Sequence, residues 1–192
     1  LEIMKKVVII ILATFLVGAG SLYLLGFYPV ARVNGEFMLY RMYSERTKAF
    51  ERFETKTRLA KGTVALTDSE RMELQKITLQ NLIVEQVFFQ YAKDHTALSG
   101  LADSANTIVT NTLKEADPDV LPRAAKEVYG WSVEEFAKNV LYPQAFQNEL
   151  QKAIESEEGA SFEEFRQTQL NNAQVWLYAV PWKWENGGLV NK

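Results

Sequence analysis

The sequence predicts a mainly α-helical protein, in which an N-terminal transmembrane helix precedes a multi-helix domain closed by a small two-stranded sheet. An uncharged apolar run occupies residues 7–28. Helix-start signals and amphipathic periodicity recur through the middle of the chain. The strand-like segments 30–33 and 174–180 lie at opposite ends of the remaining sequence. Because a strand of a few residues is not stable alone in water, we expect these two segments to pair.

Residues 1–28 are expected to be a membrane anchor. The 22 residues from 7 to 28 would form a helix about 33 Å long, which is close to the thickness of a bilayer's hydrocarbon core. Lys5 and Lys6 precede this run, so the positive-inside rule places the N-terminus in the cytoplasm and the following domain on the extracytoplasmic side of the cell membrane. A cleaved signal peptide is the alternative, with cleavage near residues 18–20 and secretion of the domain.

The expected domain, residues 29–184, begins with a short strand and a tight turn. Residues 30–33 are rich in β-branched side chains, and Asn34-Gly35 tolerates the positive φ angles that such a turn needs. Residues 37–39 are candidates to complete a small hairpin. A helix is expected from about residue 40 to residue 59. Its inward stripe consists of Leu39, Tyr43, Phe50 and Phe53.

Three segments with the S/T-x-x-E spacing of a capping box mark helix starts in the rest of the domain. They begin at Thr67, Ser132 and Ser161. The helix from Thr67 to about residue 94 has apolar residues over more than half of its circumference, so it is the expected central helix. Pro143 is expected to kink the helix at 132–156, because proline removes a backbone hydrogen bond. Further helices are expected at 99–116, before Gly130 and at 161–172, and residues 185–192 are expected to be a flexible tail.

Composition excludes several classes of function. The formal net charge is −3, so the chain lacks the basic field that a nucleic-acid partner requires. There is no cysteine, which excludes disulfides and zinc-cysteine sites. The single histidine, His95, lies at the expected end of a helix, where a lone exposed histidine is more often a surface residue than a metal ligand or a catalytic base. No phosphate loop or hydrolase motif is present. We therefore expect no enzyme activity, no catalytic residue, no metal and no cofactor.

Three motifs resemble, in order, the SurA N-terminal domain family, the chaperone core of SurA-, PrsA- and PpiD-type exported folding factors. They are VARVNG at residues 30–35, LTD at residues 66–68 and YGWSVEEF at residues 129–136. The resemblance covers most of residues 30–180. It implies a helical core, closed by a C-terminal strand, that holds unfolded exported polypeptides without ATP. Most relatives also contain a parvulin isomerase domain, but the sequence between the expected helices and the closing strand is too short for one. The paired histidines of parvulin sites are also absent.

The aromatic residues of the C-terminal third are the candidate contacts for such clients, although core packing is the alternative for each. The candidate peptide-binding residues are Trp131, Tyr142, Trp176 and Tyr178. A second group is expected at the membrane interface, because strand pairing would return the C-terminus to the anchor. This group consists of Tyr23, Phe27, Tyr28, Trp182 and Trp184. The alternative functions are a non-catalytic envelope scaffold with one fixed partner and a divergent peptidyl-prolyl isomerase.

Overall fold

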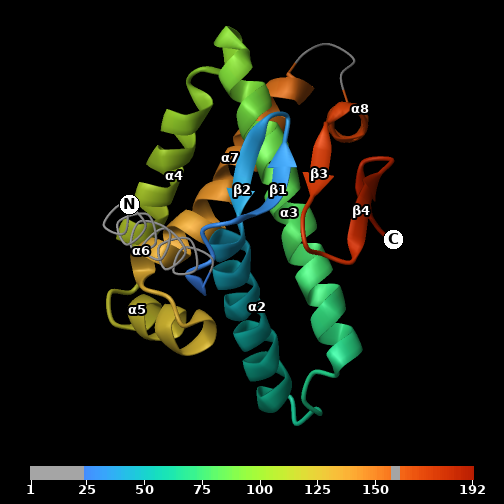
Figure 1. Cartoon of the computed structure of the whole chain (residues 1–192). Coiled ribbons are helices and arrows are strands. Elements are labelled where there is room, and N and C mark those ends of the chain that lie inside the picture. The colour runs from blue at the N-terminus through green and yellow to red at the C-terminus, as the bar shows by residue number, and fades with distance from the viewer. Residues whose placement is uncertain (1–23, 157–160) are drawn as a thin grey trace, which may run out of the picture.

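The structure, a computed structural model, describes residues 24–156 and 161–192 as a mainly helical body with two small sheets. The helices are α2 (Tyr40–Ala60), α3 (Asp68–Asp94), α4 (Leu101–Glu115), α5 (Val120–Ala124), α6 (Val133–Phe136), α7 (Tyr142–Glu155) and α8 (Phe162–Asn172). A 3-10 turn, η1 (Thr96–Leu98), and two π-helical turns, η2 (Ala125–Tyr129) and η3 (Ala137–Leu141), connect some of them. In Figure 1, α2 and α3 form a long pair, with α4 to α7 on one side of it and α8 with the C-terminal strands on the other.

The predicted fold class is wrong in its membrane helix and in its sheet. Across residues 24–156 and 161–192, no helix combines the length and the apolar character that crossing a bilayer requires. Most of the expected span lies outside the described residues. Its last part, residues 25–28, is turn and irregular backbone rather than helix, because Gly26 adopts the left-handed conformation (φ 75°) that ends helices.

The sheet that joins the two ends of the domain has three strands rather than two. β1 (Pro29–Val33) pairs antiparallel with β3 (Val175–Leu177) on one side and with β2 (Glu36–Leu39) on the other. The strand order is therefore β2-β1-β3. β2 joins because the turn after β1 is only two residues long, which returns the chain directly alongside β1.

Asn34 connects this turn to the central helix and to the last segment before β3. Asn34 and Gly35 have φ angles of 46° and 93°, as a two-residue type I′ turn requires. The Asn34 side chain donates to Gln90 Oε1 on α3 at 3.0 Å and accepts from the backbone N–H of Gln174 at 2.8 Å. The backbone N–H of Asn34 donates to the Gln174 carbonyl at 2.8 Å. Gln90 in turn donates to the Val33 carbonyl at 3.0 Å, so Asn34 and Gln90 together attach the sheet to α3.

Residues 185–192, expected to be a flexible tail, instead complete a second hairpin. β4 (Trp182–Glu185) pairs antiparallel with β5 (Gly188–Asn191). Asn186 and Gly187, with φ angles of 50° and 76°, form the turn between them. The Leu189 side chain is buried in the core, and its backbone N–H donates to Gln80 Oε1 on α3 at 3.2 Å. The hairpin therefore packs against the same helix that carries the first sheet.

Alanine at Gly187 is expected to destabilise the protein more than alanine at Gly35. Both residues have a positive φ, and that conformation costs a residue with a Cβ about 1 kcal/mol. A Cβ at Gly187 would also lie 3.0 Å from Asn171 Oδ1 and 3.1 Å from Leu170 Cβ, whereas the nearest atom to a Cβ at Gly35 is Arg32 Nη2 at 4.0 Å. We expect Gly187→Ala to lose about 2 kcal/mol and Gly35→Ala about 1 kcal/mol in urea unfolding. Equal losses would contradict the crowding at Gly187.

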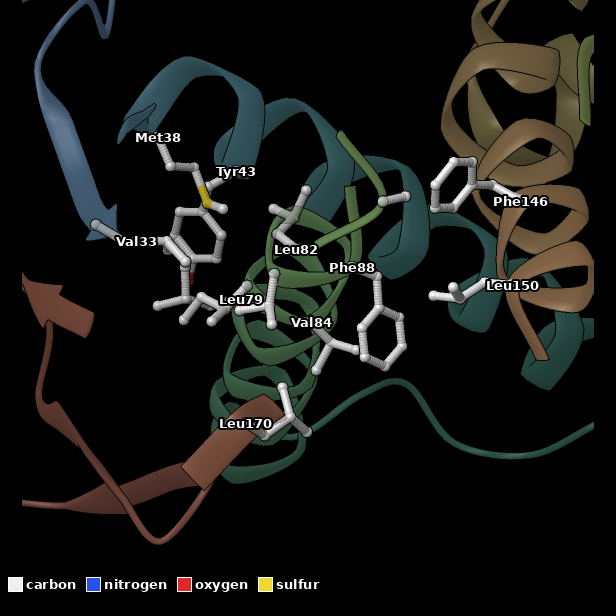
Figure 2. Close-up of a cluster of buried hydrophobic side chains, with 14 of the residues drawn as sticks. Val33, Met38, Tyr43, Leu79, Leu82, Val84, Phe88, Phe146, Leu150 and Leu170 are labelled. Carbon is white, nitrogen blue, oxygen red and sulfur yellow. The ribbon is translucent and has the colours of Figure 1, made fainter. Parts of the chain in front are cut away.

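The main core surrounds α3, and the prediction that this helix is central is confirmed. Its capping box is present, with Thr67 accepting from the Glu70 backbone N–H and Glu70 accepting from the Thr67 N–H. Figure 2 shows apolar side chains from β1, β2, α2, α7 and α8 gathered around it. The core residues labelled there are Val33, Met38, Tyr43, Leu79, Leu82, Val84, Phe88, Phe146, Leu150 and Leu170. Each fully buried apolar side chain of this kind contributes about 1.5–3 kcal/mol.

The helix predicted at 132–156 is confirmed as a continuous helical run over residues 133–155, with a π-helical turn just before the proline. α6 is followed by the π-helical turn η3, and α7 starts one residue before Pro143. A π turn is wider than an α turn, so it accommodates the proline ring and the N–H that proline lacks. The capping box at Ser132 is complete, whereas at Ser161 only the contact from the Glu164 N–H to the serine hydroxyl is present, at 3.5 Å.

Candidate peptide-binding groove

An open groove of about 700 Å³ lies between the α2–α3 pair and the segment from η2 to α7. Apolar and aromatic side chains come from both walls. On the α2–α3 wall these residues are Met42, Ala49, Leu82 and Phe89, and on the opposite wall they are Tyr129, Trp131, Tyr142 and Pro143. Lining of this kind, with a few polar groups among apolar ones, is typical of binding sites.

A second pocket of about 490 Å³ adjoins the groove and is lined mostly by apolar residues of α3, η1, α4 and α7. Phe89 and Tyr142 line both cavities. Their rings stack at a centroid distance of 5.8 Å, and Phe146 meets Phe89 edge-on at 4.5 Å. The groove and this apolar pocket are therefore adjacent and share one aromatic wall.

The outer wall of the groove, formed by the segment from η2 to α7, depends on the turn at Gly130. This glycine ends η2 in the left-handed conformation, with φ 81°. The turn lets the Trp131 backbone N–H donate to the Ala125 carbonyl at 3.3 Å. Tyr129 and Trp131 then stack with their ring centroids 5.5 Å apart, and Trp131 meets Phe50 of α2 edge-on at 6.2 Å. Trp131 is thus largely buried as part of the wall.

A largely buried ion pair joins the two helices of the α2–α3 wall, and its arginine also reaches the opposite wall. Arg46 Nη1 on α2 lies 2.6 Å from each carboxylate oxygen of Glu85 on α3. Arg46 Nη2 donates to Asn139 Oδ1 on η3 at 3.3 Å. Only 6% of the Arg46 surface is exposed. Burial raises the pKa of the Glu85 carboxyl, and the guanidinium opposes that rise. The pair holds α2, α3 and η3 in a fixed arrangement.

Sequence reasoning missed Arg46 and Glu85, although a signal was present. Arg46 follows Tyr43 by three residues, and Glu85 follows Leu82 by three residues, so each charged residue lies on the apolar face of its helix. Opposite charges at inward positions of two helices that are expected to pack predict a buried pair, because neither charge is stable in the core alone.

The four predicted peptide-binding residues do not come together in one site. Trp131 and Tyr142 line the groove. Trp176 and Tyr178 lie on β3 and just beyond it, and they are 49% and 38% exposed. Two of the predicted residues therefore lie in a concave site, and the other two lie on a flat one.

The flat site is the outer face of the three-stranded sheet. Arg32 on β1 is directly opposite Phe37 on β2 and Trp176 on β3. Its guanidinium lies 5.5 Å from the centre of the Phe37 ring and 5.7 Å from that of the Trp176 ring. These cation–π contacts order three exposed side chains into a row across the sheet.

The residues expected at a membrane interface have different environments. Trp182 is 3% exposed and belongs to the main core, and Trp184 packs against it, so neither side chain has the open surface position expected for it. Phe27 is partly exposed beneath the Arg41 guanidinium, 5.5 Å from its ring centre. Tyr28 stacks on Tyr40 at 4.8 Å. Tyr23 lies outside the described residues.

Within the part of the chain that the structure describes, no cluster of three or more histidine, aspartate or glutamate side chains is placed to hold a metal ion. His95 is stacked on Tyr91, and its Nδ1 lies 2.7 Å from the Tyr91 carbonyl oxygen. Comparison of the chain with family models, with curated proteins and with solved structures finds no match. The resemblance to SurA-type chaperones therefore depends on the sequence motifs alone.

Proposed function

We propose that this protein is a non-catalytic, ATP-independent chaperone that binds unfolded polypeptide in the groove and the adjoining apolar pocket. The observation that carries the proposal is the shared wall of Phe89 and Tyr142, which places the two cavities side by side. An extended polypeptide is a ligand that can contact two adjacent cavities at once. The SurA-like order of motifs supports the same function and exported polypeptides as clients.

The character of the lining favours weak and reversible binding to many sequences. Burial of apolar client side chains against apolar and aromatic surfaces is favourable, and it does not require a particular hydrogen-bonding pattern. Met42, on the α2 wall, is 43% exposed, and methionine adapts its shape to different partners. The groove is therefore suited to selecting clients by apolar character.

The test is suppression of aggregation by the full chain. Two unrelated clients, chemically unfolded citrate synthase and luciferase, would be diluted into increasing concentrations of the protein, and light scattering would be followed. We expect suppression of both clients at near-stoichiometric ratios. Met42→Gln should raise the concentration needed for half suppression about threefold, because it removes an apolar contact worth about 0.7 kcal/mol.

The matched control is Met72→Gln on α3. Met72 is 51% exposed and does not line the groove, so its replacement should leave suppression unchanged. If Met42→Gln and Met72→Gln suppress aggregation equally well, the groove is not the client site.

A scaffold that binds one fixed partner is the second candidate, and the outer sheet face favours it. The ordered row of Phe37, Arg32 and Trp176 is exposed and has a fixed geometry, which suits a single complementary surface better than a varied set of clients. A scaffold would leave both clients to aggregate, so the same assay separates the two functions.

A further inference from the structure

We infer that the groove selects polypeptide segments in which an acidic residue lies beside an apolar one. This inference rests on the proposed function, because it specifies which segment the same site binds. Its starting point is the state of the charged side chains around the groove. These are Glu45, Arg46, Lys48, Arg52, Glu85, Glu135 and Lys138.

Every acidic side chain of this lining is already engaged. Glu45 accepts from Arg41 Nε at 2.7 Å. Glu85 pairs with the buried Arg46. Glu135 accepts from the Ser132 backbone N–H at 2.7 Å, as part of the capping box, and this contact lowers the pKa of its carboxyl. A basic client would therefore have to share each carboxylate of the groove with a donor that already contacts it.

The exposed basic side chains of the groove, in contrast, are largely without partners. Lys48 on α2 and Lys138 on η3 have neither a hydrogen-bond nor an ion-pair partner among residues 24–156 and 161–192. Arg52 donates from Nε only to the carbonyl of Glu127, at 3.1 Å. The uncommitted charges of the groove are thus positive and come from both walls, although the whole chain has a formal net charge of −3.

The apolar pocket accounts for the preference for an apolar residue beside the acidic one. Past Phe89 and Tyr142, its lining adds Leu98, Ala102 and Phe146. A client whose carboxylate lies among Lys48, Arg52 and Lys138 can place a neighbouring apolar side chain there, because the two cavities share a wall. A polypeptide fits this arrangement better than an anionic membrane surface does, since a flat bilayer cannot enter a concave site.

The experiment measures binding of three fluorescein-labelled peptides to the full chain by fluorescence anisotropy. Each peptide has about ten residues, with a Leu-Phe pair followed by two glutamates, two glutamines or two lysines. We expect the glutamate peptide to bind about three- to tenfold more tightly than the glutamine peptide, and the lysine peptide to bind most weakly. Raising the salt concentration should reduce this preference, because the charges are exposed.

A double variant assigns the preference to the groove. Lys48→Glu with Lys138→Glu should remove or reverse the preference. Lys56→Glu with Lys114→Glu should preserve it, because both lysines are exposed and lie outside the groove while the change in charge is the same. Circular dichroism would check that both variants are folded.

The outcomes separate this inference from the proposed function. Equal binding of the glutamate and glutamine peptides would overturn the inference and leave the chaperone proposal intact. Failure of all three peptides to bind would overturn both. Binding of phosphatidylglycerol vesicles that depends on Lys48 and Lys138, together with equal binding of the peptides, would assign these charges to a lipid surface and also overturn the inference.

Discussion

Replacing Asn34 with alanine is expected to lower the free energy of unfolding by about 3 kcal/mol. The side chain donates to Gln90 at 3.0 Å and accepts from the Gln174 backbone N–H at 2.8 Å, and alanine makes neither hydrogen bond. Alanine must also adopt the φ of 46° at this position, which is unfavourable for a residue whose side chain cannot hydrogen-bond locally. Urea unfolding followed by far-UV circular dichroism measures the loss.

Asn34→Gly separates the two causes. Glycine adopts the positive φ without strain but still lacks the side-chain hydrogen bonds, so it should lose about 1 kcal/mol less than alanine. A loss below about 1 kcal/mol in the alanine variant would contradict the view that Asn34 attaches the sheet to α3. Hydrogen exchange at the Gln174 amide should increase in both variants, because this N–H loses its acceptor.

The parts of this fold that could be predicted are those whose causes lie within a few residues of each other. The capping boxes at Thr67 and Ser132 place both partners three residues apart, and the Asn34-Gly35 turn needs only its own dipeptide. The same reasoning applied to Asn186-Gly187 would have predicted the second hairpin. It was missed because β4 and β5 are short and depend on α3 for burial, through contacts such as that between Leu189 and Gln80.

The site was predictable only in part, because burial depends on contacts between distant elements. Aromatic content indicated Trp131 and Tyr142, and both line the groove. It also indicated Trp176, which lies on the outer face of the sheet, and Trp182, which is buried in the core. Composition does not tell these environments apart, since the register of β3 against β1 decides which side chains face outward.

The ion pair between Arg46 and Glu85 contributes to stability and lines the groove. Its disruption is expected to have the largest effect on the free energy of unfolding. Glu85→Leu alone should lower the free energy of unfolding by about 3–5 kcal/mol, because it leaves the buried Arg46 guanidinium without a counter-charge. The pair spans α2 and α3 at a distance of 2.6 Å. Glu73→Leu makes the same chemical change at an exposed position of α3, and it should change stability by less than about 0.5 kcal/mol.

The double variant Arg46→Met with Glu85→Leu separates the contribution of the ion pair to stability from its contribution to the shape of the groove. Removing both charges leaves no uncompensated ion, and Arg46 Nε already has no partner among the described residues, so the double variant should regain most of the lost stability. It should still bind client peptide less well, because Asn139 on η3 loses the guanidinium contact at 3.3 Å that positions the outer wall. Recovered unfolding energy with weakened peptide binding would show that the pair shapes the groove. Full recovery of both would mean that apolar packing alone positions this wall.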